Sequence, residues 1–314
     1  MKRGEKPPSW DPGEHRSPSK LRALMRLIRV EHTLFSLPFA YAGALLSGYS
    51  CDLTDYVWMT LAVFGLRTAG MAYNNIADLD IDRLNPRCSK RPLVTGALKP
   101  RDAWMLVVAG SLLYLLSAAM LNKYALLLSP IPWAMAMSYP HAKRIHWMPH
   151  LHLGLVLSLT VLGGAVAASG DEARSLVEAL KSVPWIYLAA VTLWVAGFDI
   201  LYSIMDIDFD RKMRLGSAPS KLGIPGALLL ALAMHIITSA LLIASVKIYE
   251  LGVAYIVATA SASALMLLQH VLVRQSLSNI PRAFNLNLII GLIITLGIIV
   301  DEALQTQALV VYGG

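Results

Sequence analysis

The sequence predicts an all-α membrane protein, a bundle of nine transmembrane helices around a central cavity that opens to the cytoplasm, built from two related halves. The first observation is composition. Of the 314 residues 56% are hydrophobic and 15% are charged, and the mean hydropathy is +0.56, which is too apolar for a soluble domain of this size. The other two observations are the spacing of the apolar stretches and the distribution of basic residues between them.

Nine apolar stretches are candidate spans, and most approach the ~20 residues that a helix needs to cross the hydrocarbon core. They cover residues 33–48, 56–73, 103–121, 124–137, 152–168, 185–205, 224–246, 251–273 and 284–300. The fourth stretch is short and contains Pro130 and Pro132, so we expect it to be kinked.

The chain is expected to form a single membrane domain over residues 21–314. Residues 1–20 are rich in proline and charge and lack the apolar core of a signal peptide. This composition predicts a flexible cytoplasmic tail.

Basic residues fall mainly on one side of the predicted bundle. With nine spans, 22 of the 27 Lys and Arg residues lie in the N-terminal tail and the loops on that side. One missed span would destroy this asymmetry, so the pattern predicts an integral protein of the cytoplasmic membrane with its N-terminus in the cytoplasm and its C-terminus outside. Topology then explains the net charge of +7, and no nucleic-acid partner is expected.

The second span ends in an acidic motif within RTAGMAYNNIADLDIDRLNPRCSKRP. Asn74, Asp78 and Asp82 follow each other at intervals of four residues, so on a continuous helix they share one face. Three such side chains would repel each other unless a cation lies among them. Oxygen ligands suit Mg²⁺, which commonly bridges carboxylates to substrate phosphates, so the motif predicts a metal-held phosphate site.

A second motif repeats this spacing in the sixth span. Asp206 and Asp210 match Asp78 and Asp82, and Tyr202 takes the place of Asn74. Basic residues follow each motif: Arg83, Arg87, Lys90 and Arg91 after the first, and Arg211, Lys212, Arg214 and Lys221 after the second. Solvated helix ends are the alternative, but two matched motifs at the ends of membrane spans favour a functional site.

Two further groups of basic residues leave alternatives open. Arg67 lies two turns deeper than Asn74, where an unpaired charge would cost ~2.5–3.5 kcal/mol, so its partner is either an aspartate or a bound diphosphate. Lys143 and Arg144 close the fourth span, as a topological anchor or as phosphate ligands.

The paired motifs resemble the two aspartate-rich motifs of the UbiA superfamily of intramembrane prenyltransferases. Tyr139-Pro140-x-x-Lys143-Arg144 and the opening EHTLFSLPFA, residues 31–40, extend the resemblance, and the opening is similar to the 4-hydroxybenzoate polyprenyltransferase branch. Asn75 departs from the family pattern, which usually has Asp there, so we do not expect this position to supply a carboxylate to metal.

The resemblance implies Mg²⁺-dependent transfer of a prenyl group from a polyprenyl diphosphate to a small aromatic acceptor such as 4-hydroxybenzoate. The donor would ionise to an allylic carbocation and release diphosphate, a reaction of quinone and isoprenoid lipid biosynthesis. Membrane lipid is an expected partner, and no obligatory protein partner is implied.

The resemblance also implies roles for individual residues. The expected metal ligands are Asn74, Asp78, Asp82, Asp206 and Asp210. The expected diphosphate ligands are Arg67, Asn74, Arg87, Arg91, Lys143 and Arg144. Asp199, Tyr202 and Tyr139 are the candidate catalytic residues, with Asp199 and Tyr202 placed to orient or deprotonate the acceptor.

Two other functional classes remain as alternatives. Repeated halves with carboxylates inside a bundle also suit an ion-coupled secondary transporter, although the flanking bases suit an anionic head group better. The third class is a lipid-binding scaffold with an inactive site.

Several other polar or small residues carry weaker expectations. The histidines of the fifth-span entry, His141, His146, His150 and His152, are expected to be interfacial rather than metal ligands. Asn287 could position substrate or bond to another helix, and Gly163 and Gly164 permit close helix contact.

Overall fold

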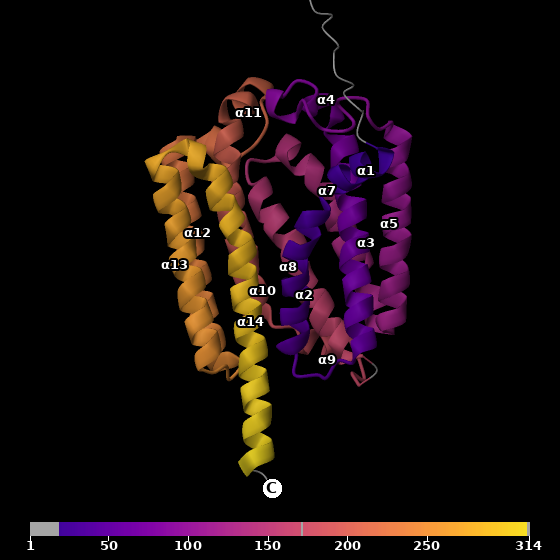
Figure 1. The fold of residues 1–314 in the computed structure, drawn as a ribbon, viewed down its shortest axis with the longest axis vertical. Helices are drawn as coiled ribbons and strands as arrows, with labels where there is room; N and C mark the ends of the chain where they lie inside the picture. The colour runs from indigo at the N-terminus through magenta and orange to yellow at the C-terminus, as the bar shows by residue number, and fades with distance from the viewer. Residues whose placement is uncertain (1–18, 171, 313–314) are drawn as a thin grey trace, which may run out of the picture.

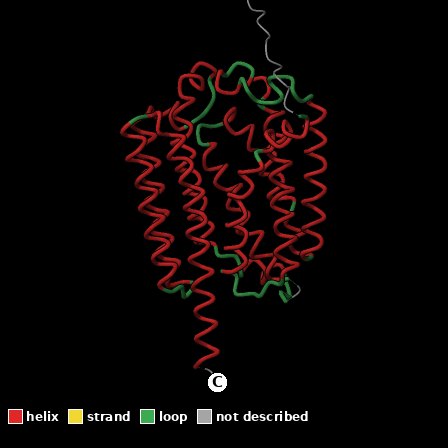
Figure 2. The backbone as a smooth tube through the Cα atoms, viewed as in Figure 1, coloured by secondary structure: helices red, strands yellow, loops and turns green. Residues whose placement is uncertain are grey.

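The computed structural model describes residues 19–170 and 172–312, which form one bundle of long helices running side by side (Figures 1 and 2). Within these ranges there is no strand, so the all-helical prediction is confirmed. The predicted tail lies outside the described residues except for its last two, and Lys20 already begins a helix.

Helices overlap all nine predicted spans, the fourth of which is divided between α6 and α7, and short helices connect several of them. The long helices are α2 (Val30–Leu45), α3 (Leu53–Ala77), α5 (Pro100–Leu121), α7 (Pro130–Ile145), α8 (Pro149–Ser169), α10 (Trp185–Ser203), α12 (Ala218–Ile248), α13 (Val253–Gln275) and α14 (Ile280–Tyr312). The short helices are α1 (Lys20–Ile28), α4 (Leu79–Asp82), α6 (Lys123–Leu128), α9 (Leu176–Lys181) and α11 (Ile207–Met213).

Six helical segments in the described part of the chain are long and apolar enough to cross a membrane. They are Pro100–Leu121, Pro149–Ser169, Trp185–Met213, Ala218–Ile248, Val253–Gln275 and Leu277–Gln305. The chain is therefore a multi-pass integral membrane protein. Helix α2 contains one further apolar stretch, Phe35–Leu45, which is shorter than these six. Six segments and one shorter stretch do not reach nine, so the full count of nine spans remains a prediction.

The predicted kink in the fourth span is confirmed as a break between α6 and α7. Ser129 separates the two helices, and Pro130 begins α7, where a missing N–H has no consequence. The Asn122 side chain caps α6 by accepting from the N–H groups of Tyr124 and Ala125. Its amide also donates to the Val166 carbonyl at 2.9 Å, which ties this broken span to α8.

Helices α2 and α8 touch backbone to backbone at a glycine of each. A Cβ on Gly164 would lie 1.8 Å from the Ala40 carbonyl oxygen, and one on Gly43 would lie 2.1 Å from that of Val161. A Cβ on Gly163 would meet nothing within 4 Å. The predicted close contact therefore belongs to Gly164 and not to its neighbour.

Buried polar groups connect the helices of the second half. Asn287 on α14 accepts hydrogen bonds from Trp194 on α10 at 3.0 Å and from Gln269 on α13 at 2.8 Å. Asn287 thus makes the interhelical hydrogen bonds that were one of its two expected roles. Asp301 caps α13 by accepting from three backbone N–H groups, those of Gly252, Ala254 and Tyr255.

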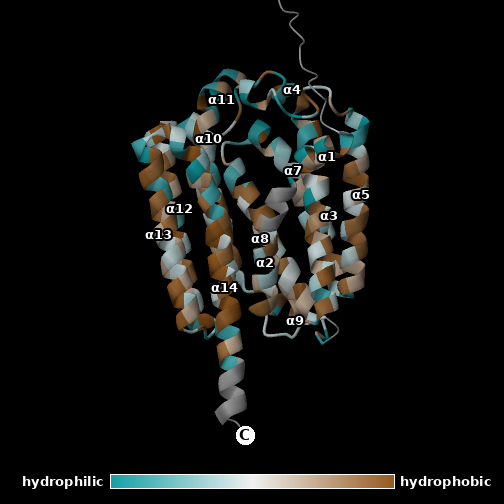
Figure 3. Ribbon diagram, viewed as in Figure 1, coloured by the Kyte–Doolittle hydropathy of each residue, from teal (hydrophilic) through white to brown (hydrophobic). Residues whose placement is uncertain are grey.

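Polar structure gathers at one end of the bundle. The short helices α1, α4 and α11 all lie at the upper end in Figure 1, whereas α14 runs past the opposite end. Figure 3 shows hydrophilic residues concentrated at this upper end and hydrophobic residues along the sides. Both aspartate motifs therefore lie at the same end of the molecule.

Candidate active site

Both aspartate motifs lie where a helix breaks. Helix α3 ends at Ala77, and Asp78 stands between α3 and α4 with φ −96° and ψ 2°. In the second motif α10 ends at Ser203 and a short 3-10 turn, Ile204–Asp206, leads into α11. The expectation that each motif lies on one face of a continuous helix is therefore wrong.

Arg144 gives a physical reason for the first break. Its Nη2 atom donates to the Ala77 carbonyl at 2.7 Å, an oxygen that in a continuous helix would accept from the N–H of Ile81. The guanidinium also pairs with Asp80 at 2.8 Å, and this hydrogen bond lowers the pKa of Asp80 to about 2. Arg144 thus holds the end of α3 from outside, and the structure does not bring it to the polar cavity described next.

The two motifs nevertheless line one polar cavity with a volume of about 200 Å³. Of the residues singled out from sequence, its wall contains Asn74, Asp78, Asp82, Arg91, Tyr139, Lys143, Asp199, Tyr202, Asp206 and Asp210. These side chains come from α3, α4, α7, α10 and α11, from the junction of α3 and α4, from the loop after α4 and from the 3-10 turn before α11. The helix breaks turn the acidic side chains of both halves toward a common space.

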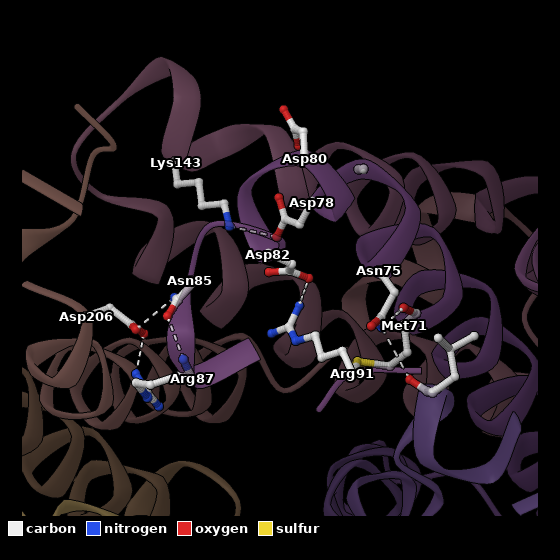
Figure 4. Close-up of polar contacts among 12 residues, drawn as sticks. Met71, Asn75, Asp78, Asp80, Asp82, Asn85, Arg87, Arg91, Lys143 and Asp206 are labelled. Atoms are coloured by element: carbon white, nitrogen blue, oxygen red, sulfur yellow. Dashed lines mark hydrogen bonds and ion pairs between the residues drawn. The ribbon is translucent and has the colours of Figure 1, made fainter. Parts of the chain in front are cut away.

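Each of three cavity aspartates is paired with a base (Figure 4). Lys143 Nζ lies 2.7 Å from Asp78 Oδ2, and Arg91 pairs with Asp82. Arg87 Nη1 lies 2.5 Å from Asp206 Oδ2 and so links the first motif's loop to the second motif. The positive charge expected among the carboxylates is thus supplied by the protein's own bases in this structure.

Burial changes the pKa of a carboxyl group in the first motif. The Asp82 side chain is only 5% exposed. Burial raises the pKa of the Asp82 carboxyl, and the neighbouring Arg91 opposes this effect. Arg91 therefore compensates the buried Asp82 carboxylate.

A second cavity, of about 380 Å³, adjoins the first and is basic. Its charged wall residues include Arg26, Arg29, Arg87, Lys90 and Arg91. Among the described residues that line it, Asp206 is the one acidic side chain. Asn74, Arg91, Tyr202 and Asp206 line both cavities, so a small anion could lie close to the acidic site.

A third cavity is apolar and contains Arg67. Its wall is formed mainly by aliphatic side chains of α3, α5, α7 and α8. Asn74 and Tyr139 line both this cavity and the polar one, so the two spaces meet at these residues. The structure places Arg67 on the apolar side of this junction and does not bring it to the wall of the polar cavity.

His150 is a site residue that sequence reasoning missed. Its ring is 2% exposed, and Nδ1 lies 2.7 Å from Asp199 Oδ2. The ring also lines the polar cavity, so the expectation that it is merely interfacial is wrong. A signal existed in the sequence, because a carboxylate such as Asp199 inside a span needs a partner.

Asn75 turns away from the acidic site, as expected for a position without a carboxylate. Its amide donates to the carbonyls of Met71 at 2.8 Å and Leu27 at 3.3 Å, and Figure 4 shows it directed toward Met71. The side chain therefore fastens α3 to α1.

The donor set fits a metal that shares its ligands with a substrate. In the part of the chain that the structure describes, no three His, Cys, Asp or Glu side chains are placed to hold a metal by themselves. Asp78 Oδ1 is nevertheless buried with no hydrogen-bond partner among the described residues, and Arg144 Nη2 lies 3.7 Å away. Mg²⁺ typically takes one or two carboxylates and completes its shell with water and substrate phosphate, which matches this arrangement.

Comparison with known proteins adds independent information. Residues 36–289 match the sequence profile of the UbiA prenyltransferase family. A 4-hydroxybenzoate octaprenyltransferase of Yersinia enterocolitica is 30% identical over 288 residues, which cover 90% of this chain and 97% of that protein. A protein of the same name from Francisella tularensis subsp. novicida is 33% identical over 196 residues, 62% of this chain and 66% of that protein.

Solved structures share the fold. The apo structure of a UbiA homolog from Aeropyrum pernix K1 is 61% identical, with a TM-score of 0.84, and the match covers 87% of this chain and 99% of that chain. A UbiA homolog from Archaeoglobus fulgidus, bound to DMAPP and Mg²⁺, is 22% identical with a TM-score of 0.64 over 87% of this chain and 99% of that chain. The second likeness concerns the fold alone.

Proposed function

Because the chain belongs to the UbiA prenyltransferase family, and so is a prenyltransferase of the membrane, we propose that it transfers a prenyl group from a polyprenyl diphosphate to a small aromatic acceptor such as 4-hydroxybenzoate. The observation that carries this proposal is the junction of the polar and apolar cavities at Asn74 and Tyr139. A prenyl diphosphate has a polyanionic head and an apolar tail, and this junction offers an environment for each.

The diphosphate head occupies the polar cavity in this proposal. Asn74, Asp78, Asp82, Asp206 and Asp210 would hold Mg²⁺, as the fold neighbour bound to DMAPP and Mg²⁺ suggests. When bound, the metal supplies positive charge that stabilises the diphosphate as the C–O bond breaks.

Three bases of the site provide further ligands for the head group. Lys143, Arg91 and Arg87 already point at cavity carboxylates, so phosphate oxygens that enter between them gain charge-assisted hydrogen bonds. Arg144 supports this set indirectly by holding the end of α3.

The prenyl tail occupies the apolar cavity. Arg67 lies seven residues before Asn74 on α3, about 10 Å along the helix axis at 1.5 Å per residue. We therefore assign it to the apolar side of the junction, beside the prenyl tail, where its positive charge attracts the anionic head. The aliphatic walls keep water from the allylic cation.

The acceptor occupies the space between the polar and basic cavities. A carboxylate such as that of 4-hydroxybenzoate would bind the basic wall formed by Arg26, Arg29 and Lys90. The ring carbon then forms a bond to the allylic carbon, and the proton that this carbon loses passes to the Asp199 carboxylate. Tyr202, which lines both of these cavities, and Tyr139, which lines the polar one, orient the acceptor ring.

The membrane orientation follows from charge. The end that carries α1, α4 and α11 in Figure 1 includes both motifs, and most of the basic residues belong to the segments at this end. By the excess of Lys and Arg on cytoplasmic loops, we place this end in the cytoplasm and the C-terminus outside.

An acceptor screen tests the proposal. Purified full-length protein is incubated with labelled geranylgeranyl diphosphate, Mg²⁺ and either 4-hydroxybenzoate or 4-hydroxybenzyl alcohol, which lacks the carboxylate. We expect a prenylated product from 4-hydroxybenzoate and much less from the alcohol. Pyrophosphate release without any prenylated acceptor would refute the aromatic acceptor, and the absence of Mg²⁺-dependent pyrophosphate release would refute prenyl transfer from this donor.

A further inference from the structure

His150 makes two hydrogen bonds that together fix its ring. His150 is the second residue of α8, and its ring lies between α10 and the start of α12. Nδ1 lies 2.7 Å from Asp199 Oδ2, and Nε2 lies 3.1 Å from the backbone nitrogen of Ala218. Both ring nitrogens are therefore occupied by protein groups.

These contacts determine where the ring carries its hydrogen. A backbone N–H can only donate, so Nε2 must be the acceptor in the contact with Ala218 and carries no hydrogen. The hydrogen of the neutral ring is then on Nδ1, and it is donated to the Asp199 carboxylate. A doubly protonated ring would direct a second N–H at the N–H of Ala218 and lose this contact.

The backbone around Ala218 is held rigidly over the ring. The Gly216 nitrogen donates to the Lys143 carbonyl at 2.6 Å, and a Cβ on Gly216 would lie 2.1 Å from the His146 carbonyl oxygen. Ser217 caps α12 by accepting from the N–H of Ser220. The loop before α12 is thus pinned against the α7–α8 connection, and the Ala218 N–H has little freedom to leave Nε2.

We propose that His150 is a positioning residue for prenyl transfer, which holds Asp199 Oδ2 so that the remaining carboxylate oxygen faces the acceptor and takes its proton. This inference rests on the proposed function, in which Asp199 is the proton acceptor. His150 does not itself touch the acceptor in this scheme, because its one hydrogen is directed at Asp199. It acts by restricting the rotation of the carboxylate through the hydrogen bond that Nδ1 donates to Oδ2.

The test compares two substitutions at position 150 with a matched histidine. His150→Leu removes the donor, whereas His150→Asn can place an amide N–H where Nδ1 lies. His146→Asn is the control, because His146 is an exposed histidine of the same connection and does not line the polar cavity. The full-length protein is supplied with labelled geranylgeranyl diphosphate, Mg²⁺ and 4-hydroxybenzoate, and prenylated acceptor, prenyl alcohol and pyrophosphate are measured together.

We expect His150→Leu to lower kcat for acceptor prenylation by about 10–100-fold, as for other groups that orient a reacting side chain. The KM for geranylgeranyl diphosphate should stay near the wild-type value, and the ratio of prenyl alcohol to prenylated acceptor should rise because water captures the cation. His150→Asn should recover part of the lost rate, and His146→Asn should match the wild type.

A double substitution completes the test and remains informative if His150→Leu folds poorly. In the Asp199→Asn background, His150→Asn should cause little further loss, because the two residues act as one unit. Independent, multiplicative losses would overturn the inference. So would a loss below about threefold for His150→Leu, a parallel rise in the KM for the diphosphate, or an equal loss in His146→Asn.

The two levels of proposal fail in different ways. A wild-type protein without Mg²⁺-dependent prenyl transfer would refute the proposed function itself. A fully active wild type together with an unimpaired His150→Leu variant would refute only the role of His150.

Discussion

At the scale of residues, three aspartates of the site are already paired with Lys or Arg side chains. Lys143 and Asp78 are 2.7 Å apart, and Arg87 and Asp206 are 2.5 Å apart, each pair joining segments distant in sequence. Such pairs compensate the charge of these carboxylates when no diphosphate is bound. The same bases are then available as ligands when a phosphate enters.

The first prediction concerns the metal. Asp78→Ala and Asp206→Ala should each reduce turnover to less than about a tenth of the wild-type value, because metal stabilisation of the leaving group supplies several kcal/mol. Diphosphate binding should also weaken. Turnover and Mg²⁺-dependent binding of geranylgeranyl diphosphate are measured beside the melting temperature, and a stable variant that keeps more than this activity would argue against a metal role.

The second prediction separates donor binding from acceptor capture. Asp199 lies seven residues before Asp206, and its contact is with His150 rather than with the bases that pair with the two motifs. Asp199→Asn should therefore lower prenyl transfer while sparing Mg²⁺-dependent diphosphate binding. If both quantities fell together, Asp199 would belong to the metal site.

The third prediction concerns Arg67 at the boundary of the apolar cavity. Arg67→Lys should lose most activity, because a point charge on a flexible stem does not reproduce the planar fork of donors, and Arg67→Leu should bind diphosphate weakly. Binding is measured by titration with geranylgeranyl diphosphate in the presence of Mg²⁺. Unchanged affinity in a folded Arg67→Leu variant would assign Arg67 a purely structural role.

The sequence indicated the charged residues of the site but not the partners of those charges. The aspartates of the motifs and Lys143 were found because charge at the end of an apolar span is conspicuous. The partners of each charge were not found, because pairs such as Asp199 with His150 are separated by 49 residues and form only when the helices pack. The sequence indicates that Asp199 needs a partner, but not which residue supplies it.

At the scale of helices, the structure differs from the prediction at the aspartate motifs, where the spacing of the residues does not show whether the helix is continuous. Asp82 N–H still bonds to the Asp78 carbonyl at 2.8 Å, although α3 has ended before Asp78. Intervals of four residues are therefore compatible with both an unbroken and a broken helix. The break in the fourth span was predictable, because Pro130 imposes it locally.

The fourth prediction concerns the contact between α2 and α8. Gly164→Ala should destabilise the protein by about 1–3 kcal/mol, because the added methyl group meets the Ala40 backbone. Gly163→Ala is the matched neighbour and should not lower stability, since its Cβ meets open space and alanine favours the helix. Thermal unfolding in detergent measures both variants, and equal melting temperatures would contradict the contact.

At the scale of the whole molecule, three cavities of different chemistry meet around Asn74, Tyr139 and Tyr202. The polar cavity shares Tyr139 with the apolar cavity and Tyr202 with the basic one. Such an arrangement suits a reaction between a lipid diphosphate and a small anion inside a membrane. Composition and motif pairing predicted the helical membrane fold and the acidic site, whereas the cavities depend on how the helices pack and could not be derived from the chain alone.

The central claim is that a prenyl diphosphate ionises in the polar cavity with the help of Mg²⁺. The most direct measurement is pyrophosphate release from geranylgeranyl diphosphate by the purified protein with 4-hydroxybenzoate, in the presence of Mg²⁺ and then of excess EDTA. We predict release with Mg²⁺, loss of at least about tenfold in EDTA and recovery when Mg²⁺ is restored. Release that is unaffected by EDTA, or absent from a folded protein that binds the diphosphate, would contradict the account.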